Sequence, residues 1–242
     1  MTGYGVKINT EREMMHNWKI QIDKNNYLDV KVDTCCFSAT FNKEDLEQIQ
    51  KFYNDKNKKI NFIEKVKVDN ICYKNRTKLI ASWQSESKHS EKALGLIMFN
   101  PSFANPKNCD DTVRNAIKFA NKEGYNKIIV FNLFPIRISD ADIVCKYYKN
   151  KKEFLKDYKC EINIDDLPEK IVLCWGKLPK HIPYIDSIIE KLYSKLTAEN
   201  KILCQITDDD FQRHLSSPSI NSIGGIKELK LTKIQSIYKF NK

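Results

Sequence analysis

The stretch Ala93-Leu-Gly-Leu-Ile-Met-Phe-Asn-Pro-Ser102 decides the fold of this chain. From Leu94 to Phe99 it is an unbroken apolar run, which is typical of a strand buried on both faces of a parallel sheet. The strand must end at Asn100-Pro101-Ser102, because proline fixes the backbone dihedral φ and asparagine favours turns. We therefore expect the chain after about residue 93 to be an α/β domain whose chemistry centres on this turn.

Further apolar runs and amphipathic stretches follow in alternation. The chain is expected to contain strands at 127–132, 171–175 and 201–205 and helices at 110–122 and 182–196. This order indicates a parallel sheet with helices on both faces. The prediction is a three-layer α/β/α domain with a four-stranded parallel sheet over residues 89–242, and the polar stretch 84–92 is the candidate boundary. A Lys-rich helical excursion is expected at 139–169.

Residues 1–88 have a different pattern and are predicted to form a small β-rich N-terminal extension. The runs 18–23 and 27–32 alternate polar and apolar residues around an Asn-rich turn, which predicts a β-hairpin. An acidic start and apolar residues at helical spacing favour a helix at 42–53. A short strand is expected at 60–68.

The composition is basic, with 41 Lys and Arg against 31 Asp and Glu and a net charge of +10. This excess favours an acidic partner, such as nucleic acid or an acidic protein. AT-rich coding is the alternative explanation, because Lys and Asn are both abundant throughout the chain. No stretch is long and apolar enough for a membrane span, and the N-terminus has no signal-peptide pattern, so a cytoplasmic protein without a membrane partner is expected.

The eight cysteines form no C-x-x-C pair, and the four histidines lie far from them in sequence, so no zinc site is expected. Cys174 and Cys204 fall in predicted strands, which favours buried, reduced thiols. Asp208-Asp209-Asp210 is interpreted as a solvated turn, because three adjacent acids point in different directions. No metal and no cofactor is predicted.

Polar residues follow each predicted parallel strand, and sites in such sheets form at the carboxyl ends of the strands. Asn100 follows the first strand, Asn132 ends the second and Gly176 follows the third; His214 comes after the fourth. Each has an ordinary structural explanation as a turn, a strand end or a surface residue. Their convergence on one edge is what indicates a site.

Taken in order, these segments resemble a bacterial domain family of unknown function that is related to the uracil-DNA glycosylase superfamily. The resemblance covers roughly residues 93–225 and is closest to pseudo uracil-DNA glycosylases carried by mobile genetic elements. The segments that carry it are Asn100-Pro-Ser102, Asn105-Pro106, Asp110-Asp-Thr112 with Arg114, Gly124-Tyr125, Val130-Phe-Asn-Leu-Phe-Pro135 with Arg137, and Leu173-Cys-Trp-Gly176.

The resemblance implies a role for each matching position. Asn100 would position the attacking water, beside Pro101 and Ser102 in the base-binding turn, and Phe103 would stack on a flipped base. Asn132 would read the base edge through two hydrogen bonds, and His214 would contact the base carbonyl. The residues expected on the DNA-facing or partner-facing surface are Arg114, Arg137, Arg213, Ser217, Pro218 and Ser219.

The departures from that pattern point away from catalysis. No Asp stands in the water-activating position, Phe99 places a bulky side chain directly before Asn100, and the prolines around the His motif are reduced to one. Losing one preorganised stabilising group typically costs about 10²–10³ in rate. The sequence therefore favours a catalytically silent pseudo-enzyme that binds an acidic DNA-mimic inhibitor of uracil-DNA glycosylases.

Two alternatives remain open at the level of the sequence. One is an active DNA glycosylase on uracil or a modified base, with Asn100 and His214 as catalytic residues. The other is non-catalytic binding of nucleic acid through phosphate contacts, against which a plain solvated face must be weighed. The lysines of the helical excursion that would make these contacts are Lys146, Lys149, Lys151 and Lys152.

Overall fold

The computed structural model places part of the chain well enough to describe. The described residues are 10–12, 16–38, 47–48, 50–52, 54, 74–84, 91–101, 104, 109–134, 136, 138, 140–150, 162–176, 185–206, 214–215 and 232–233. The strand predicted at 60–68 and the acidic run at 208–210 lie outside them. Of the helix predicted at 42–53, residues 47, 48 and 50–52 are helical.

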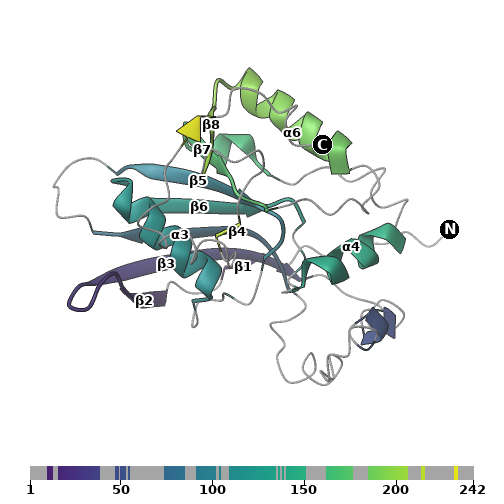
Figure 1. Ribbon diagram of the computed structural model, residues 1–242, viewed down its shortest axis with the longest axis horizontal. Coiled ribbons are helices and arrows are strands. Elements are labelled where there is room, and N and C mark those ends of the chain that lie inside the picture. The colour runs from purple at the N-terminus through teal and green to yellow at the C-terminus, as the bar shows by residue number, and fades with distance from the viewer. Residues whose placement is uncertain are drawn as a thin grey trace.

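The strands of the described part join one mixed sheet of nine strands in the order β1-β3-β4-β6-β5-β7-β8-β9, with β2 also paired to β3 (Figure 1). Five strand pairs are antiparallel and three are parallel. The strands are β1 (Thr10–Arg12), β2 (His16–Gln21), β3 (Tyr27–Ser38), β4 (Lys74–Trp83), β5 (Ala93–Met98), β6 (Lys127–Asn132), β7 (Lys170–Leu173), β8 (Ile202–Gln205) and β9 (Thr232–Lys233).

The α/β class is confirmed, but the prediction of a four-stranded parallel sheet is wrong. The four expected strands do pair in parallel, in the order β6-β5-β7-β8. They are the central section of a larger sheet, because β4 pairs antiparallel with β6 and β9 pairs antiparallel with β8. Both outer strands of the parallel section thus bond their free backbone groups to further strands, which removes exposed edges.

The expected N-terminal hairpin is present and extends this same sheet. Strands β2 and β3 pair with Gln21 opposite Tyr27. The Asp23 carboxylate accepts hydrogen bonds from the backbone N–H groups of Asn25 and Asn26, at 2.9 and 3.0 Å, which closes the turn. Since β3 pairs with β4 and β4 with β6, the N-terminal strands belong to the sheet that carries the α/β section. The boundary at residue 88 stays a prediction.

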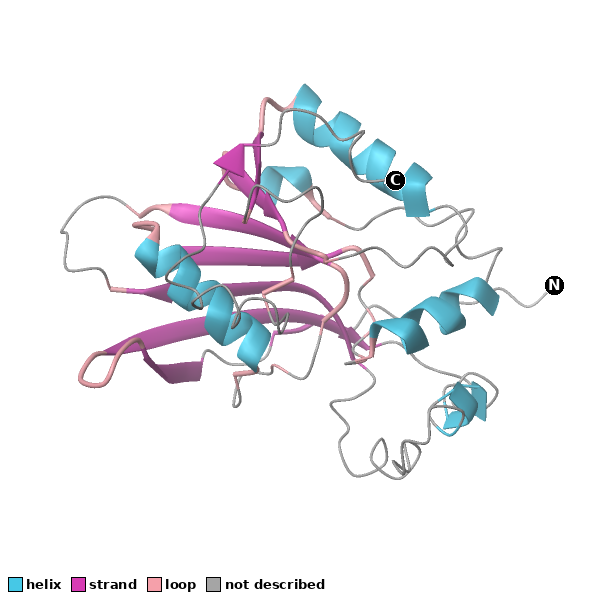
Figure 2. Cartoon of the chain, viewed as in Figure 1, coloured by secondary structure: helices cyan, strands magenta, loops and turns pink. Residues whose placement is uncertain are grey.

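Helices cover both faces of the sheet (Figure 2). Helix α3 (Asp111–Lys122) packs on one face through Val113, Ile117 and other buried residues. Helices α4 (Ala141–Asn150) and α6 (Ile185–Ala198) pack into the core on the other face, and a 3-10 turn, η1 (Ile164–Asp166), precedes β7. We call these the α3-side core and the α6-side core. Alternation along each central strand sends successive side chains to the two cores in turn.

Gly95 is the tightest point of the central strand β5. A Cβ atom there would lie 3.2 Å from Ile171 Cγ1 and 3.2 Å from Pro168 Cδ. We expect Gly95→Val to lower the free energy of unfolding by about 1–3 kcal/mol, because the neighbouring strand must move to admit the side chain. Denaturant unfolding followed by circular dichroism measures the change.

The matched control is Gly124→Asn. Gly124 has a φ of +80° and no atom within 4 Å of its would-be Cβ. Asparagine tolerates this left-handed conformation, so its effect should stay within about 0.5 kcal/mol. Equal destabilisation by the two substitutions would contradict the steric account of Gly95.

Candidate functional site

The carboxyl ends of β5, β6 and β7 meet at one edge of the sheet. Met98 pairs with Asn132 in the last β5–β6 position, so the turn at Asn100 lies beside the end of β6. Backbone bonds continue past the strand ends, from Leu133 N–H to Met98 O at 2.8 Å and from Cys174 N–H to Ile97 O at 2.9 Å. The predicted convergence of polar residues at this edge is confirmed for Asn100 and Asn132.

Asn132 is the unusual residue of this edge. It ends β6, where alternation from Ile128 and Val130 places its side chain on the α3 side. Only 5% of Asn132 is exposed, and within the described part of the chain neither its Nδ2 nor its Oδ1 has a hydrogen-bond partner. A buried, unpaired amide costs about 1–3 kcal/mol and requires an explanation. A ligand that supplies one acceptor and one donor would provide it.

Asn100 differs from Asn132 because its amide is already bonded. Its Nδ2 donates to the backbone oxygens of Pro101 and Ile138. Both donors of the amide are therefore directed at main-chain acceptors, and the side chain is held in one orientation. The remaining Oδ1 can accept a hydrogen bond, but a carboxamide has no basic group that would take a proton from water.

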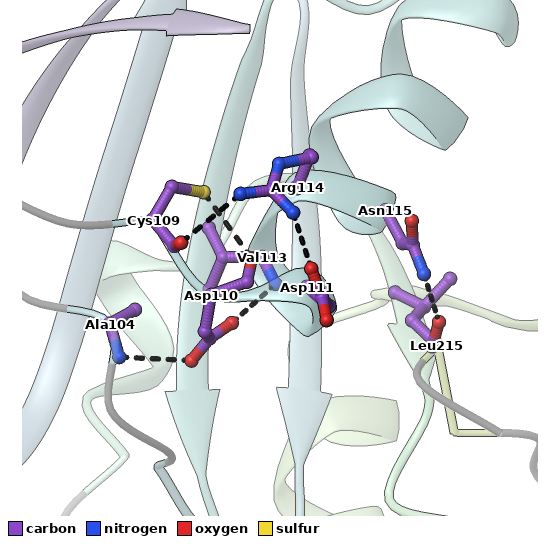
Figure 3. Close-up of polar contacts among 8 residues, drawn as sticks. All are labelled: Ala104, Cys109, Asp110, Asp111, Val113, Arg114, Asn115 and Leu215. Atoms are coloured by element: carbon purple, nitrogen blue, oxygen red, sulfur yellow. Dashed lines mark hydrogen bonds and ion pairs between the residues drawn. The ribbon is translucent and has the colours of Figure 1, made fainter.

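The start of α3 is organised by Asp110 (Figure 3). One carboxylate oxygen accepts from Val113 N–H at 2.8 Å and caps the helix, as the sequence predicts. The other accepts from Ala104 N–H at 2.9 Å. The chain beyond the Asn100 turn is thereby fixed to the helix. Cys109, just before the cap, is half-buried, and burial together with the nearby Asp110 raises the pKa of its thiol to about 12.

A buried arginine, Arg76, reaches the same place from β4. Arg76 is 2% exposed, and its guanidinium donates to Ala104 O at 3.1 Å. The register of β3 and β4 shifts between Cys35 and Cys36, which pair with Lys78 and Arg76. This bulge places the side chain of Arg76 on the same face of the sheet as that of Leu79, which is the α3 side. Burial of Arg76 is not predicted by the sequence, because a single arginine in a polar stretch carries no signal of burial.

His214 closes the other side of this cluster. A Cβ on Gly176 would lie 3.1 Å from the Cβ of His214, so the glycine after β7 is what lets the His214 segment come so close. Burial lowers the pKa of His214, and the negative charge of Asp110 opposes part of that shift. Leu215 is fully buried in the α3-side core, and its carbonyl accepts from Asn115 Nδ2 at 2.8 Å (Figure 3). Asn115 is a second residue whose contact with this cluster the sequence does not predict.

Arg114 lies at the rim of the site, with 40% of its side chain exposed. Its guanidinium pairs with Asp111 and donates to Cys109 O at 3.4 Å (Figure 3). Its predicted place on the surface is consistent with this exposure. Among the described residues around the start of α3, the positive charges of Arg76 and Arg114 balance the negative charges of Asp110 and Asp111.

Two aromatic residues near the strand ends, Phe99 and Trp175, pack into the α6-side core. The ring of Phe99 contacts Phe134 edge-on there, with centroids 5.2 Å apart. The side chain of Phe99 therefore lies on the opposite face of the sheet from that of Asn132. Pro101 is buried. The predicted site residues outside the described ranges are Ser102, Phe103, Arg137, Arg213, Ser217, Pro218 and Ser219.

The described residues bear on the predictions about buried thiols, metal ligands and membrane-spanning helices. Cys174 and Cys204 are buried thiols outside any disulfide, as predicted. Within the described ranges, no three His, Cys, Asp or Glu side chains gather closely enough to hold a metal ion. None of the helices in those ranges is both long and apolar enough to cross a bilayer. The cytoplasmic location stays a prediction.

Comparison with known proteins gives one match. A family model described as "Protein of unknown function (DUF1643)" covers residues 76–214, which is more than half of the chain. The match begins at Arg76 on β4 and ends at His214. Neither the curated proteins nor the solved structures contain a match to the chain. The expected family of unknown function is thus confirmed, while its relation to uracil-DNA glycosylases stays a prediction.

The environment of His214 leads to a titration experiment. Replacement of Asp110 by Asn keeps a good helix cap but removes the negative charge, so the pKa of His214 should fall further below its ordinary value of 6.5. The pH dependence of the His214 Cε1–H signal in NMR measures this. As a control, Asp166→Asn removes an acid that pairs with Lys78 and should leave the signal unchanged. A rise in the His214 pKa on Asp110→Asn would contradict the proposed electrostatics.

Proposed function

The chain belongs to the DUF1643 family of proteins of unknown function, and we propose that it recognises a nucleobase, or a group that mimics one, without cleaving it. In this proposal the fold is a uracil-DNA-glycosylase-like scaffold that serves for binding. Its macromolecular partner is an acidic DNA-mimic inhibitor of uracil-DNA glycosylases. The proposal joins the order of motifs in the sequence with the arrangement of Asn132, Asn100 and His214.

The observation that carries the proposal is the unpaired amide of Asn132. An amide side chain presents one acceptor and a donor pair side by side, which complements the amide edge of a pyrimidine or purine base. Both polar atoms are inaccessible to water in the described structure. A ligand must therefore enter through a local opening, and it then replaces the missing hydrogen bonds. Such a site also discriminates strongly, since a ligand without the matching groups leaves the amide unpaired.

The state of Asn100 supports binding without cleavage. Hydrolysis of a glycosidic bond needs a group that orients water and accepts its proton, or that stabilises the departing charge. Asn100 has both amide hydrogens engaged by main-chain oxygens and carries no base. It can hold a water molecule through Oδ1 but cannot deprotonate it. Activation of the attacking water is then weak at this position.

The acidic partner is supported by charge. The chain carries a net charge of +10, and within the described ranges the two arginines and two aspartates at the start of α3 balance one another. The charge that would attract the partner is therefore that of the chain as a whole. Long-range attraction of this kind accelerates association with an acidic protein surface, whereas the site itself would provide specificity.

An active DNA glycosylase is the second candidate, and the environment of His214 favours it. Burial lowers the pKa of this histidine, so the ring stays neutral at pH 7. A neutral imidazole can donate a hydrogen bond to a base oxygen on which charge develops. In that case Asn100 would orient the water and His214 would stabilise the leaving base.

The unpaired amide makes an unusual prediction for Asn132→Leu. Leucine has nearly the same shape without polar atoms, so this substitution should raise the free energy of unfolding by about 1 kcal/mol. It should also abolish binding of uracil or of a uracil-containing oligonucleotide. Denaturant unfolding and calorimetric titration measure the two effects.

Asn126→Leu is the matched control at the other end of β6. Its Oδ1 accepts a hydrogen bond from Lys92 N–H at 2.8 Å, so the same change should destabilise the protein and leave base binding intact. If Asn132→Leu were destabilising and binding were unaffected, the role of Asn132 in recognition would have to be abandoned.

The choice between the two candidate functions rests on two assays with the intact protein. We expect a pull-down with an acidic uracil-DNA-glycosylase inhibitor to give a complex at roughly micromolar concentration. Duplexes with uracil, hypoxanthine or modified pyrimidines should yield no abasic sites. Abasic product that disappears with Asn100→Ala would establish the active enzyme instead. Absence of any complex would remove the inhibitor as the partner.

A further inference from the structure

The turn that carries Asn100 is followed by a residue whose backbone is bonded on both sides. Ala104 N–H donates to Asp110 Oδ2 at 2.9 Å, and Ala104 O accepts from Arg76 at 3.1 Å. Before the turn, Phe99 O accepts from Phe134 N–H at 2.9 Å. Phe99 and Ala104, which stand on either side of the turn in sequence, are therefore each held by groups from other elements.

Arg76 is the costliest of these groups to bury. Arg76 is 2% exposed, and a charged group is removed from water only when other polar groups compensate it. One compensating group is the Ala104 carbonyl, and the carboxylate of Asp110 binds the N–H group of the same residue. Asp110 also caps α3, so the arginine, the turn and the helix start form one connected unit.

The bulge in β4 explains how Arg76 enters this unit. Leu79 and Ala81 of β4 belong to the α3-side core, and unbroken alternation would send residue 76 to the opposite face. Between Lys78 and Arg76 the register against β3 shifts by one residue, and the guanidinium contacts Ala104, which is part of the α3-side core. Bulges commonly redirect a side chain beside a functional site. Asn132 and Arg76 thus lie on the same face, at the same edge of the sheet.

We propose that Arg76 is the positioning residue of the base-recognition site, holding the Asn100 turn in place by clamping Ala104 together with Asp110. It acts through Ala104 and does not contact the ligand. The link to ligand affinity rests on the proposed function, whereas the clamp itself does not. In Arg76→Met an apolar side chain of similar length would fill much of the space and remove the guanidinium donor from the Ala104 carbonyl. Lysine would keep the charge and one donor but not the planar fork.

The test compares Arg76→Met, Arg76→Lys and the native chain by amide hydrogen exchange followed by NMR. We expect exchange at Ala104 N–H to accelerate at least about tenfold in Arg76→Met and by less in Arg76→Lys, because the bond to Asp110 opens more often when the carbonyl is released. Exchange at Cys174 N–H, which bonds to Ile97 O, should stay as it is in the native chain. Equal acceleration at both amides would mean general loosening and would overturn the proposal, as would unchanged exchange at Ala104.

Lys78→Met is the matched control on the same strand. Lys78 pairs with Asp166 at 3.0 Å and lies outside the Arg76 cluster, so Ala104 should exchange at the native rate. In a second arm, the affinity for uracil should fall about tenfold in Arg76→Met and recover in part in Arg76→Lys. If the native chain binds no uracil, the proposed function fails while the exchange experiment still decides the clamp. If uracil binds equally well to the native chain and to Arg76→Met, the positioning role is refuted.

Discussion

The two hydrogen bonds accepted by Asp110 are the constraint on which the site depends. A single carboxylate caps α3 through Val113 N–H and fixes the far end of the Asn100 turn through Ala104 N–H. It also faces His214 closely enough to raise the pKa of that imidazole against the effect of burial. Segments that are distant in sequence thus meet at one acidic group, and the helix start and the turn cannot move independently.

The two asparagines at the carboxyl edge illustrate how the same side chain can take opposite roles. Asn100 donates its amide hydrogens to Pro101 O and Ile138 O, which stabilises a turn and leaves Oδ1 as an acceptor. Asn132 is buried without a partner among the described residues, which costs stability and preserves an unused recognition group. Natural proteins retain such a cost mainly where function requires it. The arrangement therefore favours recognition over water activation.

Sequence patterns predicted the elements better than their assembly. The apolar run at Leu94–Phe99, the alternating hairpin strands and the acidic cap of α3 encode their structures locally, and all three are present. Strand β4 is not among the predicted strands, and its antiparallel pairing with β6 depends on contacts between distant segments that no local pattern specifies. Burial of Arg76 depends on a bulge and on a carbonyl that lies 28 residues away in sequence. Asn132 could be singled out because it ends a buried parallel strand, whereas its lack of a hydrogen-bond partner among the described residues depends on packing.

The separation of charge in this chain bears on how recognition would work. Among the described residues around the start of α3, two arginines and two aspartates balance one another, and burial lowers the pKa of His214. An uncharged base suits these groups better than a phosphate does, since an anion would have to be desolvated beside Asp110 and Asp111. The net charge of +10 belongs to the chain as a whole, and salt screens its long-range attraction. Attraction of an acidic partner and recognition of a base are then separate interactions, and only the first should weaken steeply as ionic strength rises.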